Sequence, residues 1–133
     1  MTLNEAQRWI RFAEEDLRAA EILFREGIYN QVCFHAQQCV EKCIKAVFLA
    51  QRRLPPKVHA IARLLSLLET HPFEGLEEEL ILLDRFYIST RYPDALPGSL
   101  PEGMPTREDA ESALWVARKA YEMTRRYAGK SEE

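Results

Sequence analysis

The stretch YNQVCFHAQQCVEKCIKAVFLAQR, residues 29–52, decides the fold of this chain. Its apolar residues recur at intervals of three and four, a period that places them on one wide face of an α-helix. A helix of this length spans roughly 30–36 Å at 1.5 Å per residue, so we expect it to be the central helix of the domain. The apolar face consists of Val32, Cys33, Ala36, Cys39, Val40, Cys43, Ile44, Val47 and Phe48.

A second long amphipathic helix is expected before this stretch. Thr2 and Glu5 have the spacing of a capping box, and Gly27 suits the left-handed conformation that often ends a helix. Because only a short turn then separates the two helices, they are predicted to form an antiparallel pair. The apolar positions of this first helix are Leu3, Ala6, Ile10, Ala13, Leu17, Ala20 and Phe24.

Two helices are expected after the proline pair at residues 55–56, which breaks the chain. A short third helix is predicted over residues 61–68, where isoleucine and leucine recur at helical spacing. A fourth helix begins at Leu76 and ends near Arg91, because Pro93 disfavours helical geometry in the residue before it.

A long surface loop and a last helix complete the predicted chain. Residues 93–105 contain four prolines and two glycines, so neither a helix nor a central strand can persist there. Loops of this length are often functional, and a plain crossover is the alternative. Thr106 and Asp109 have capping-box spacing and open the last helix, which runs to about Tyr127.

These patterns predict an all-α fold, an up-and-down helical bundle of four long helices plus a short fifth helix. No segment shows the alternating pattern of a strand. We expect residues 1–128 to form a single domain and residues 129–133 to be a polar tail.

The composition fits a small globular protein of the cytoplasm. The 133 residues are 47% hydrophobic and 29% charged, which is too apolar for intrinsic disorder. A net charge of −3, with both signs mixed along the chain, gives no broad cationic field for duplex nucleic acid. We expect no membrane span, because no apolar run approaches about 18 residues.

Three residues of the central helix invite comparison with a zinc site. His35, Cys39 and Cys43 follow one another at four-residue steps, and histidine and cysteine are common zinc ligands. His35 and Cys43 are nevertheless separated by about 12 Å of helix rise, which bonds of about 2.0–2.3 Å cannot close around one metal. We therefore interpret the cysteines as small core residues with reduced thiols, and we expect neither a metal nor a cofactor.

The polar face of the central helix has two interpretations. Glu41 and Lys45 have the favoured orientation of an i,i+4 ion pair, and a solvated face is the expectation. If another element covers this face, its amides and charges need partners and become binding or dimer-specifying groups. The residues of this face are Gln37, Gln38, Glu41, Lys42 and Lys45.

Arg91 at the end of the fourth helix also has two interpretations. Its charge would interact favourably with the helix dipole and pair with Asp84 or Asp94. It would equally offer a planar guanidinium to a phosphate, with Tyr92 as a stacking surface and Asp94 fixing the guanidinium. The spacing alone leaves both open.

Three segments in their order along the chain resemble the HEPN family. They are the run from Tyr29 to Ala46 with its Ala-Gln-Gln sequence, Lys57-Val-His59 before the leucine-rich helix, and Ser89-Thr-Arg-Tyr-Pro-Asp94. The resemblance covers nearly the whole chain and is to small prokaryotic HEPN proteins related to the C-terminal domain of sacsin. It implies a helical bundle that commonly dimerises. Many such members are encoded beside a minimal nucleotidyltransferase in toxin–antitoxin-like pairs, and others are described as nucleotide-binding.

The resemblance also implies an incomplete catalytic motif. In active HEPN ribonucleases an arginine meets the phosphate, and a histidine four to six residues further along acts in RNA cleavage. The matching arginine here is Arg91, but the positions for the histidine hold Leu96, Pro97 and Gly98. None of these side chains transfers a proton at neutral pH.

We therefore expect a homodimeric HEPN protein that binds a nucleotide, RNA or a nucleotidyltransferase partner in a toxin–antitoxin-like pair. Two other functions stay open, a metal-independent endoribonuclease toxin with His35 or His59 supplied from elsewhere, and a purely structural dimeric adaptor. Arg53 and His59 also have the motif's spacing, but they flank the proline pair. The expected binding residues are Arg91, Tyr92 and Asp94, with His35, Gln38, Glu41 and His59 as secondary candidates.

Overall fold

A computed structural model describes residues 4–87 and 103–129 of the chain. These residues contain no β-strand, and the predicted all-α helical bundle is confirmed. None of the described helices is both long and apolar enough to cross a membrane. The helices are α1 (Glu5–Arg25), α2 (Tyr29–Ala50), α3 (Ile61–Ser66), α4 (Glu77–Leu82), α5 (Asp84–Tyr87) and α6 (Arg107–Ala128).

Local capping sets the two ends of α1. The Asn4 side chain accepts a hydrogen bond from the Gln7 backbone N–H, and the Gln7 side chain accepts one from the Asn4 N–H. The predicted Thr2–Glu5 capping box is therefore wrong, because Asn4 forms the reciprocal pair and leaves Glu5 in the first helical turn. At the other end Gly27 has the predicted left-handed conformation, with φ of +77°, and turns the chain into α2.

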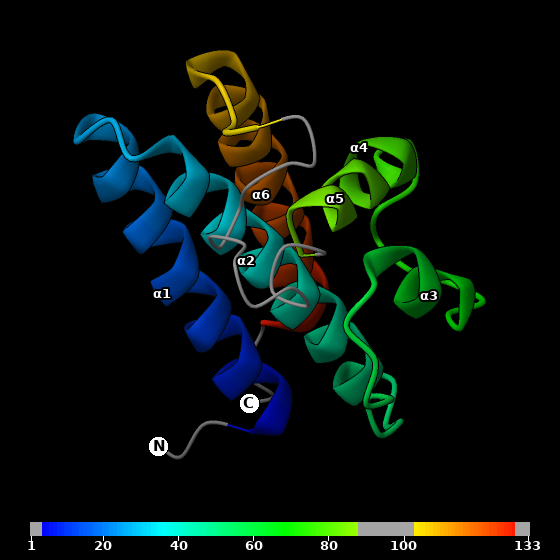
Figure 1. The fold of residues 1–133 in the computed structure, drawn as a ribbon. Coiled ribbons are helices and arrows are strands. Elements are labelled where there is room, and N and C mark those ends of the chain that lie inside the picture. Colours follow the sequence, from blue (N-terminus) through cyan, green and yellow to red (C-terminus); the bar gives the residue numbers. More distant parts are fainter. Residues whose placement is uncertain (1–3, 88–102, 130–133) are drawn as a thin grey trace.

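The long helices α1, α2 and α6 enclose the core (Figure 1). α1 and α2 form the predicted antiparallel hairpin. Side-chain contacts that join α1 to α6 include Tyr121 to Glu14 at 3.1 Å and Arg118 to Glu21 at 3.0 Å, and their order shows that these helices are antiparallel. The core side chains on the long helices include Ala13, Leu17, Ala20, Val32, Cys39, Val40, Ile44, Phe48, Ala113, Leu114 and Ala117.

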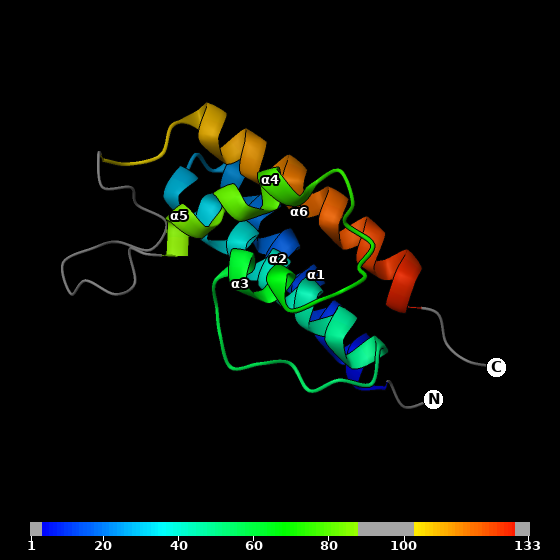
Figure 2. The ribbon, with the colours of Figure 1, turned by 90° about the vertical axis from the view of Figure 1, so that its right-hand side faces the viewer.

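The short helices α3, α4 and α5 lie on the side of α2 that faces away from α1 (Figure 1), and they stand in front of the long helices in Figure 2. Each short helix contributes a buried side chain to the core, Leu64 from α3, Leu80 from α4 and Phe86 from α5. The predicted fourth helix is divided, because α4 ends at Leu82 and α5 begins at Asp84. Its expected end near residue 91 lies outside the described residues.

The end of α2 and the start of α6 are set by the local backbone and by capping. α2 ends at Ala50, and Arg52, the predicted last residue of that helix, instead has a left-handed φ of 60°. Before α6, the predicted capping box is confirmed, because Thr106 accepts from the Asp109 N–H and Asp109 accepts from the Thr106 N–H. Apart from residues 103–105, the predicted loop 93–105 lies outside the described residues.

Candidate functional site

A buried carboxylate on α2, Glu41, is the centre of the candidate site. Its Oε2 atom accepts from Lys45 Nζ at 3.0 Å and lies 3.0 Å from His59 Nδ1. The predicted Glu41–Lys45 pair is confirmed. The expectation that this face is solvated is wrong for Gln37, Glu41 and Lys45, which are 0%, 6% and 7% exposed. They are covered by parts of the same chain, including the segment that carries His59.

Three separate contacts hold His59 and the chain around it. Its side chain contacts Glu41, and its carbonyl oxygen accepts from Gln37 Nε2 at 3.4 Å. Two residues further on, the Asp84 carboxylate accepts from the backbone N–H groups of Ile61 and Ala62 at 2.7 and 3.0 Å. Asp84 therefore caps α3 from α5, and the position of His59 is fixed from α2 and α5 together.

The His59 side chain remains accessible. It is 53% exposed, and its ring lies 5.3 Å from the Tyr87 ring at an interplanar angle of 26°. Because Nδ1 faces Glu41, the other ring nitrogen, Nε2, is the atom available to a ligand. Within the described ranges no hydrogen bond reaches Nε2.

The second oxygen of Glu41 has no hydrogen-bond partner among the described residues, although it is buried. The negative charge of this carboxylate acts on neighbouring groups, since burial reduces screening by water. Its effect on the pKa of Asp84 is an example. Burial raises the pKa of Asp84 and the charge of Glu41 adds to the increase, although the N–H groups of Ala62 and Ile61 oppose it.

Another polar cluster lies where α2 packs against α1. Asp16 Oδ1 lies 2.8 Å from His35 Nδ1, and Asp16 Oδ2 accepts from Lys42 Nζ. Both carboxylate oxygens thus have partners. Burial alone would raise the pKa of Asp16, but the hydrogen bonds from His35 and Lys42 outweigh it and hold the pKa below its ordinary value.

The three thiols of α2 belong to the core. Cys33, Cys39 and Cys43 are fully buried, as the sequence predicted. Burial raises the pKa of Cys33 to about 12, and a hydrogen bond with Cys43, together with burial, raises the pKa of Cys39. His35 faces Asp16 instead of the thiols. In the part of the chain that is described, no group of three metal-ligating side chains gathers.

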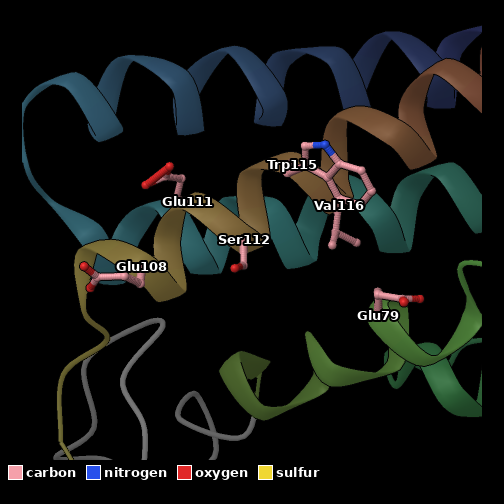
Figure 3. A pocket seen from close by; sticks show the side chains of 6 residues that line it. All are labelled: Glu79, Glu108, Glu111, Ser112, Trp115 and Val116. Atoms are coloured by element: carbon pink, nitrogen blue, oxygen red, sulfur yellow. The ribbon is translucent and has the colours of Figure 1, made fainter.

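A shallow pocket of about 520 Å³ between α4 and α6 is a weaker candidate site. Figure 3 shows that its side chains spread over α6 and α4 without converging on one point. Three of them are carboxylates and none is a cation, so the pocket does not favour a phosphate. The lining residues are Glu79, Glu108, Glu111, Ser112, Trp115 and Val116.

Comparison with known proteins identifies the family. The model of the HEPN domain matches residues 6–127. The chain belongs to the HEPN family. Among solved structures, TT1696 from Thermus thermophilus is 35% identical with a TM-score of 0.77, over 94% of this chain and 99% of that one. ST0689, an archaeal HEPN homologue, is 29% identical with a TM-score of 0.72, over 92% and 97%.

Two curated relatives carry functional names. "Putative toxin MJ1304" of Methanocaldococcus jannaschii is 30% identical, over 91% of this chain and 86% of that protein. "Putative toxin MJ0605" of the same organism is 32% identical, over 86% and 81%. Similarity to toxin-named proteins thus accompanies the HEPN fold along most of the chain.

The predicted site residues of this HEPN chain separate into three groups. Arg91, Tyr92 and Asp94 lie outside the described residues. Glu41 and His59 are brought together. His35 belongs to the cluster around Asp16, and Gln38 donates to the Gln37 side chain at 2.7 Å. Arg53 lies over the Phe48 ring, 4.9 Å from its centroid, at the end of α2.

Sequence reasoning missed the roles of three residues in or beside the two clusters, although it named Asp84 as a partner for Arg91. Asp16 could have been found, because it interrupts the apolar stripe of α1 three residues after Ala13 and before the small core residue Ala20. Asp84 and Tyr87 gave no local signal. Their partners, Ile61 and His59, are more than twenty residues away in sequence.

Proposed function

We propose that this HEPN protein binds single-stranded RNA and acts as the toxin-like member of a toxin–antitoxin-like pair. Arg91 binds a phosphate through its planar guanidinium, Tyr92 offers a stacking surface and Asp94 orients the guanidinium. Single-stranded RNA is favoured over a duplex because the net charge of −3 provides no broad cationic field. The names of the curated relatives support the toxin-like role.

The contact between His59 and Tyr87 carries this proposal. Tyr87 is the last described residue before the segment that contains Arg91, and its ring stacks against a half-exposed imidazole. Arg91 follows four residues further along the sequence. Aromatic rings and cationic groups are the means by which proteins bind bases and phosphates.

Fluorescence anisotropy with a labelled single-stranded RNA tests the proposal. We expect Arg91→Ala to weaken binding by about 10-fold or more, since a hydrogen bond to a charged group contributes about 1.5–3 kcal/mol. Arg126→Ala removes the same charge from an 80% exposed position on α6 and should bind as the wild type does. The proposal would be overturned if the wild type did not bind the RNA, or if Arg91→Ala bound it equally well. If the wild type bound mononucleotides but not RNA, the ligand would be a nucleotide and not RNA.

We further propose that the partner is a minimal nucleotidyltransferase and that the HEPN chain forms a homodimer in the cytoplasm, with residues 1–128 as its single domain. Expression of the chain alone should slow growth of a bacterial host. Co-expression with a nucleotidyltransferase encoded beside it should restore growth and yield a joint complex. A monomer in light scattering would contradict the proposed homodimer. Growth that is unchanged by expression of either gene would contradict the proposed toxin–antitoxin-like pair.

A further inference from the structure

The pocket between α4 and α6 has the shape of a groove for a polypeptide segment. Its lining side chains extend along α6 from Glu108 to Val116, which is roughly 12 Å of helix rise, and Glu79 of α4 lines the other side (Figure 3). In a small-molecule site a few polar groups converge on one ligand, and here they do not. A shallow groove between two helices suits a helix of another protein, which contacts such a surface over several turns.

Two large apolar side chains are exposed at this groove. Trp115 lines it from α6 and is 51% exposed. Leu82 is 61% exposed and lies one turn after Glu79, on the same face of α4. Tryptophan is enriched in protein interfaces, where its burial contributes a large share of the binding energy. The groove thus offers an apolar surface that a partner could cover.

The charge of the groove is negative and uncompensated. Glu79, Glu108 and Glu111 are exposed, and within the described parts of the chain their carboxylates form no ion pair or hydrogen bond. Asp109, which lies between two of them in sequence, is instead paired with Arg85 at 3.6 Å. A partner with cationic side chains would complement these carboxylates, whereas the phosphates of a nucleic acid would be repelled.

The Trp115 ring already contacts a cation. Lys119, one turn further along α6, places its Nζ atom 5.6 Å from the ring centroid. The ring attracts a cation at this distance because its face carries negative charge, and arginine makes such contacts more often than lysine does. An arginine from a partner can therefore take the place of Lys119 over the ring.

We propose that the groove between α4 and α6 is a docking surface for a cationic amphipathic helix of a partner protein. The apolar face of that helix covers Trp115 and Leu82, and lysines and arginines on its flanks pair with the three carboxylates. The docking surface does not depend on the proposed binding of RNA, because it shares no residue with the cluster of Glu41 and His59.

Fluorescence anisotropy with a synthetic peptide tests this surface. The probe is a labelled peptide of about 15 residues in which leucines recur every three or four positions between lysines and arginines. The full chain should bind it, and the affinity should fall as salt is added, because salt screens exposed charges. Trp115→Ala should weaken binding by about 10-fold or more, as the loss of a central interface tryptophan does. Circular dichroism checks that this variant folds.

Charge reversal tests the role of the carboxylates. Glu111→Lys should weaken peptide binding several-fold, because it places a like charge opposite the peptide. Glu15→Lys makes the same change at an exposed position of α1 and should bind the peptide as the wild type does. A scrambled peptide of the same composition has no apolar face and should bind several-fold more weakly than the amphipathic one.

Three results with the peptides would overturn the docking surface. They are a wild type that does not bind the amphipathic peptide, a Trp115→Ala variant that binds it equally well, and a scrambled peptide that binds as tightly. Light scattering adds a fourth, because self-association that is lost in Glu111→Lys would place a second copy of this chain in the groove. RNA affinity should be the same for Trp115→Ala and the wild type, so this test and that of RNA binding can fail separately.

Discussion

Two clusters on α2 have the same chemical composition and different surroundings. Each contains one carboxylate, one histidine and one lysine, Asp16 with His35 and Lys42 in the first and Glu41 with His59 and Lys45 in the second. In the first cluster each carboxylate oxygen has its own partner. In the second, both partners share one oxygen and the other has none among the described residues.

The histidines of the two clusters differ in exposure and in their place in the fold. The His35 side chain is 27% exposed and belongs to a long helix, whereas the His59 side chain is 53% exposed and precedes α3. A satisfied carboxylate between two helices has the features of a structural contact. An unsatisfied carboxylate behind an accessible imidazole has those of a chemical site. The residue types alone therefore do not assign the role, and the distribution of hydrogen bonds does.

The largest change in stability is expected from Asp16→Ala. It removes two charge-assisted hydrogen bonds between α1 and α2, so we predict a loss of about 2–3 kcal/mol in the free energy of unfolding. RNA affinity should not change, because the Glu41 cluster remains intact. Urea unfolding monitored by circular dichroism measures the loss.

Glu21→Ala is the matched control for that change. Glu21 is also an acidic residue of α1 with an ion pair, to Arg118 at 3.0 Å, but both side chains are substantially exposed. Exposed pairs contribute about 0–1 kcal/mol, so this variant should unfold almost as the wild type does. Equal losses from both variants would show that Asp16 has no special structural role.

A smaller effect is expected from Asp84→Ala, which affects the second cluster indirectly. Loss of the cap at the start of α3 should cost about 0.5–2 kcal/mol. Because α3 begins two residues after His59, RNA affinity should also fall several-fold. Glu78→Ala, at an exposed position of α4, should leave stability and RNA affinity unchanged. An RNA affinity in Asp84→Ala equal to that of the wild type would mean that α3 does not position His59.

The helices themselves were largely predictable, because their signals are local. The Thr106–Asp109 capping box, the turn at Gly27 and the Glu41–Lys45 spacing each depend on residues within a few positions. The start of α1 was misplaced because Asn4 competes with Thr2 as a cap over the same few residues.

The candidate site was only half predictable, because its other half comes from distant segments. Glu41 and His59 are eighteen residues apart and flank a proline pair, and nothing local says that the loop folds back on α2. Asp84 is still further along the chain. Burial of Glu41 therefore depends on tertiary packing, which helical periodicity does not encode. The predicted phosphate-binding residues at 91, 92 and 94 remain a proposal.

The smallest predicted effect concerns pH and distinguishes Asp16 from Asp84. The fold lowers the pKa of Asp16 below its ordinary value of 3.8. The ionised carboxylate therefore stabilises the folded protein at pH values above 3.8, and this stabilisation is lost as the pH falls through the folded pKa. The pKa of Asp84 is raised, so its contribution is present below 3.8 and is lost as the pH rises through the folded pKa.

Urea unfolding from pH 7 to pH 3 measures this difference. The stability advantage of the wild type over Asp16→Asn should narrow as the pH falls below about 4, where the unfolded carboxyl becomes protonated. The free energy of unfolding of the wild type, measured relative to that of Asp84→Asn, should instead increase as the pH falls. A pH-independent advantage over Asp16→Asn would contradict the assigned hydrogen bonds.

The central claim is that the Asp16–His35 pair is structural and that the Glu41–His59 pair belongs to the proposed RNA-binding site. The most direct test measures RNA affinity and urea unfolding side by side for His35→Ala and His59→Ala. We predict that His35→Ala lowers the free energy of unfolding and binds RNA as the wild type does, and that His59→Ala binds RNA several-fold more weakly with little loss of stability. Equal RNA affinity of both variants, or a loss of affinity in His35→Ala alone, would contradict the claim.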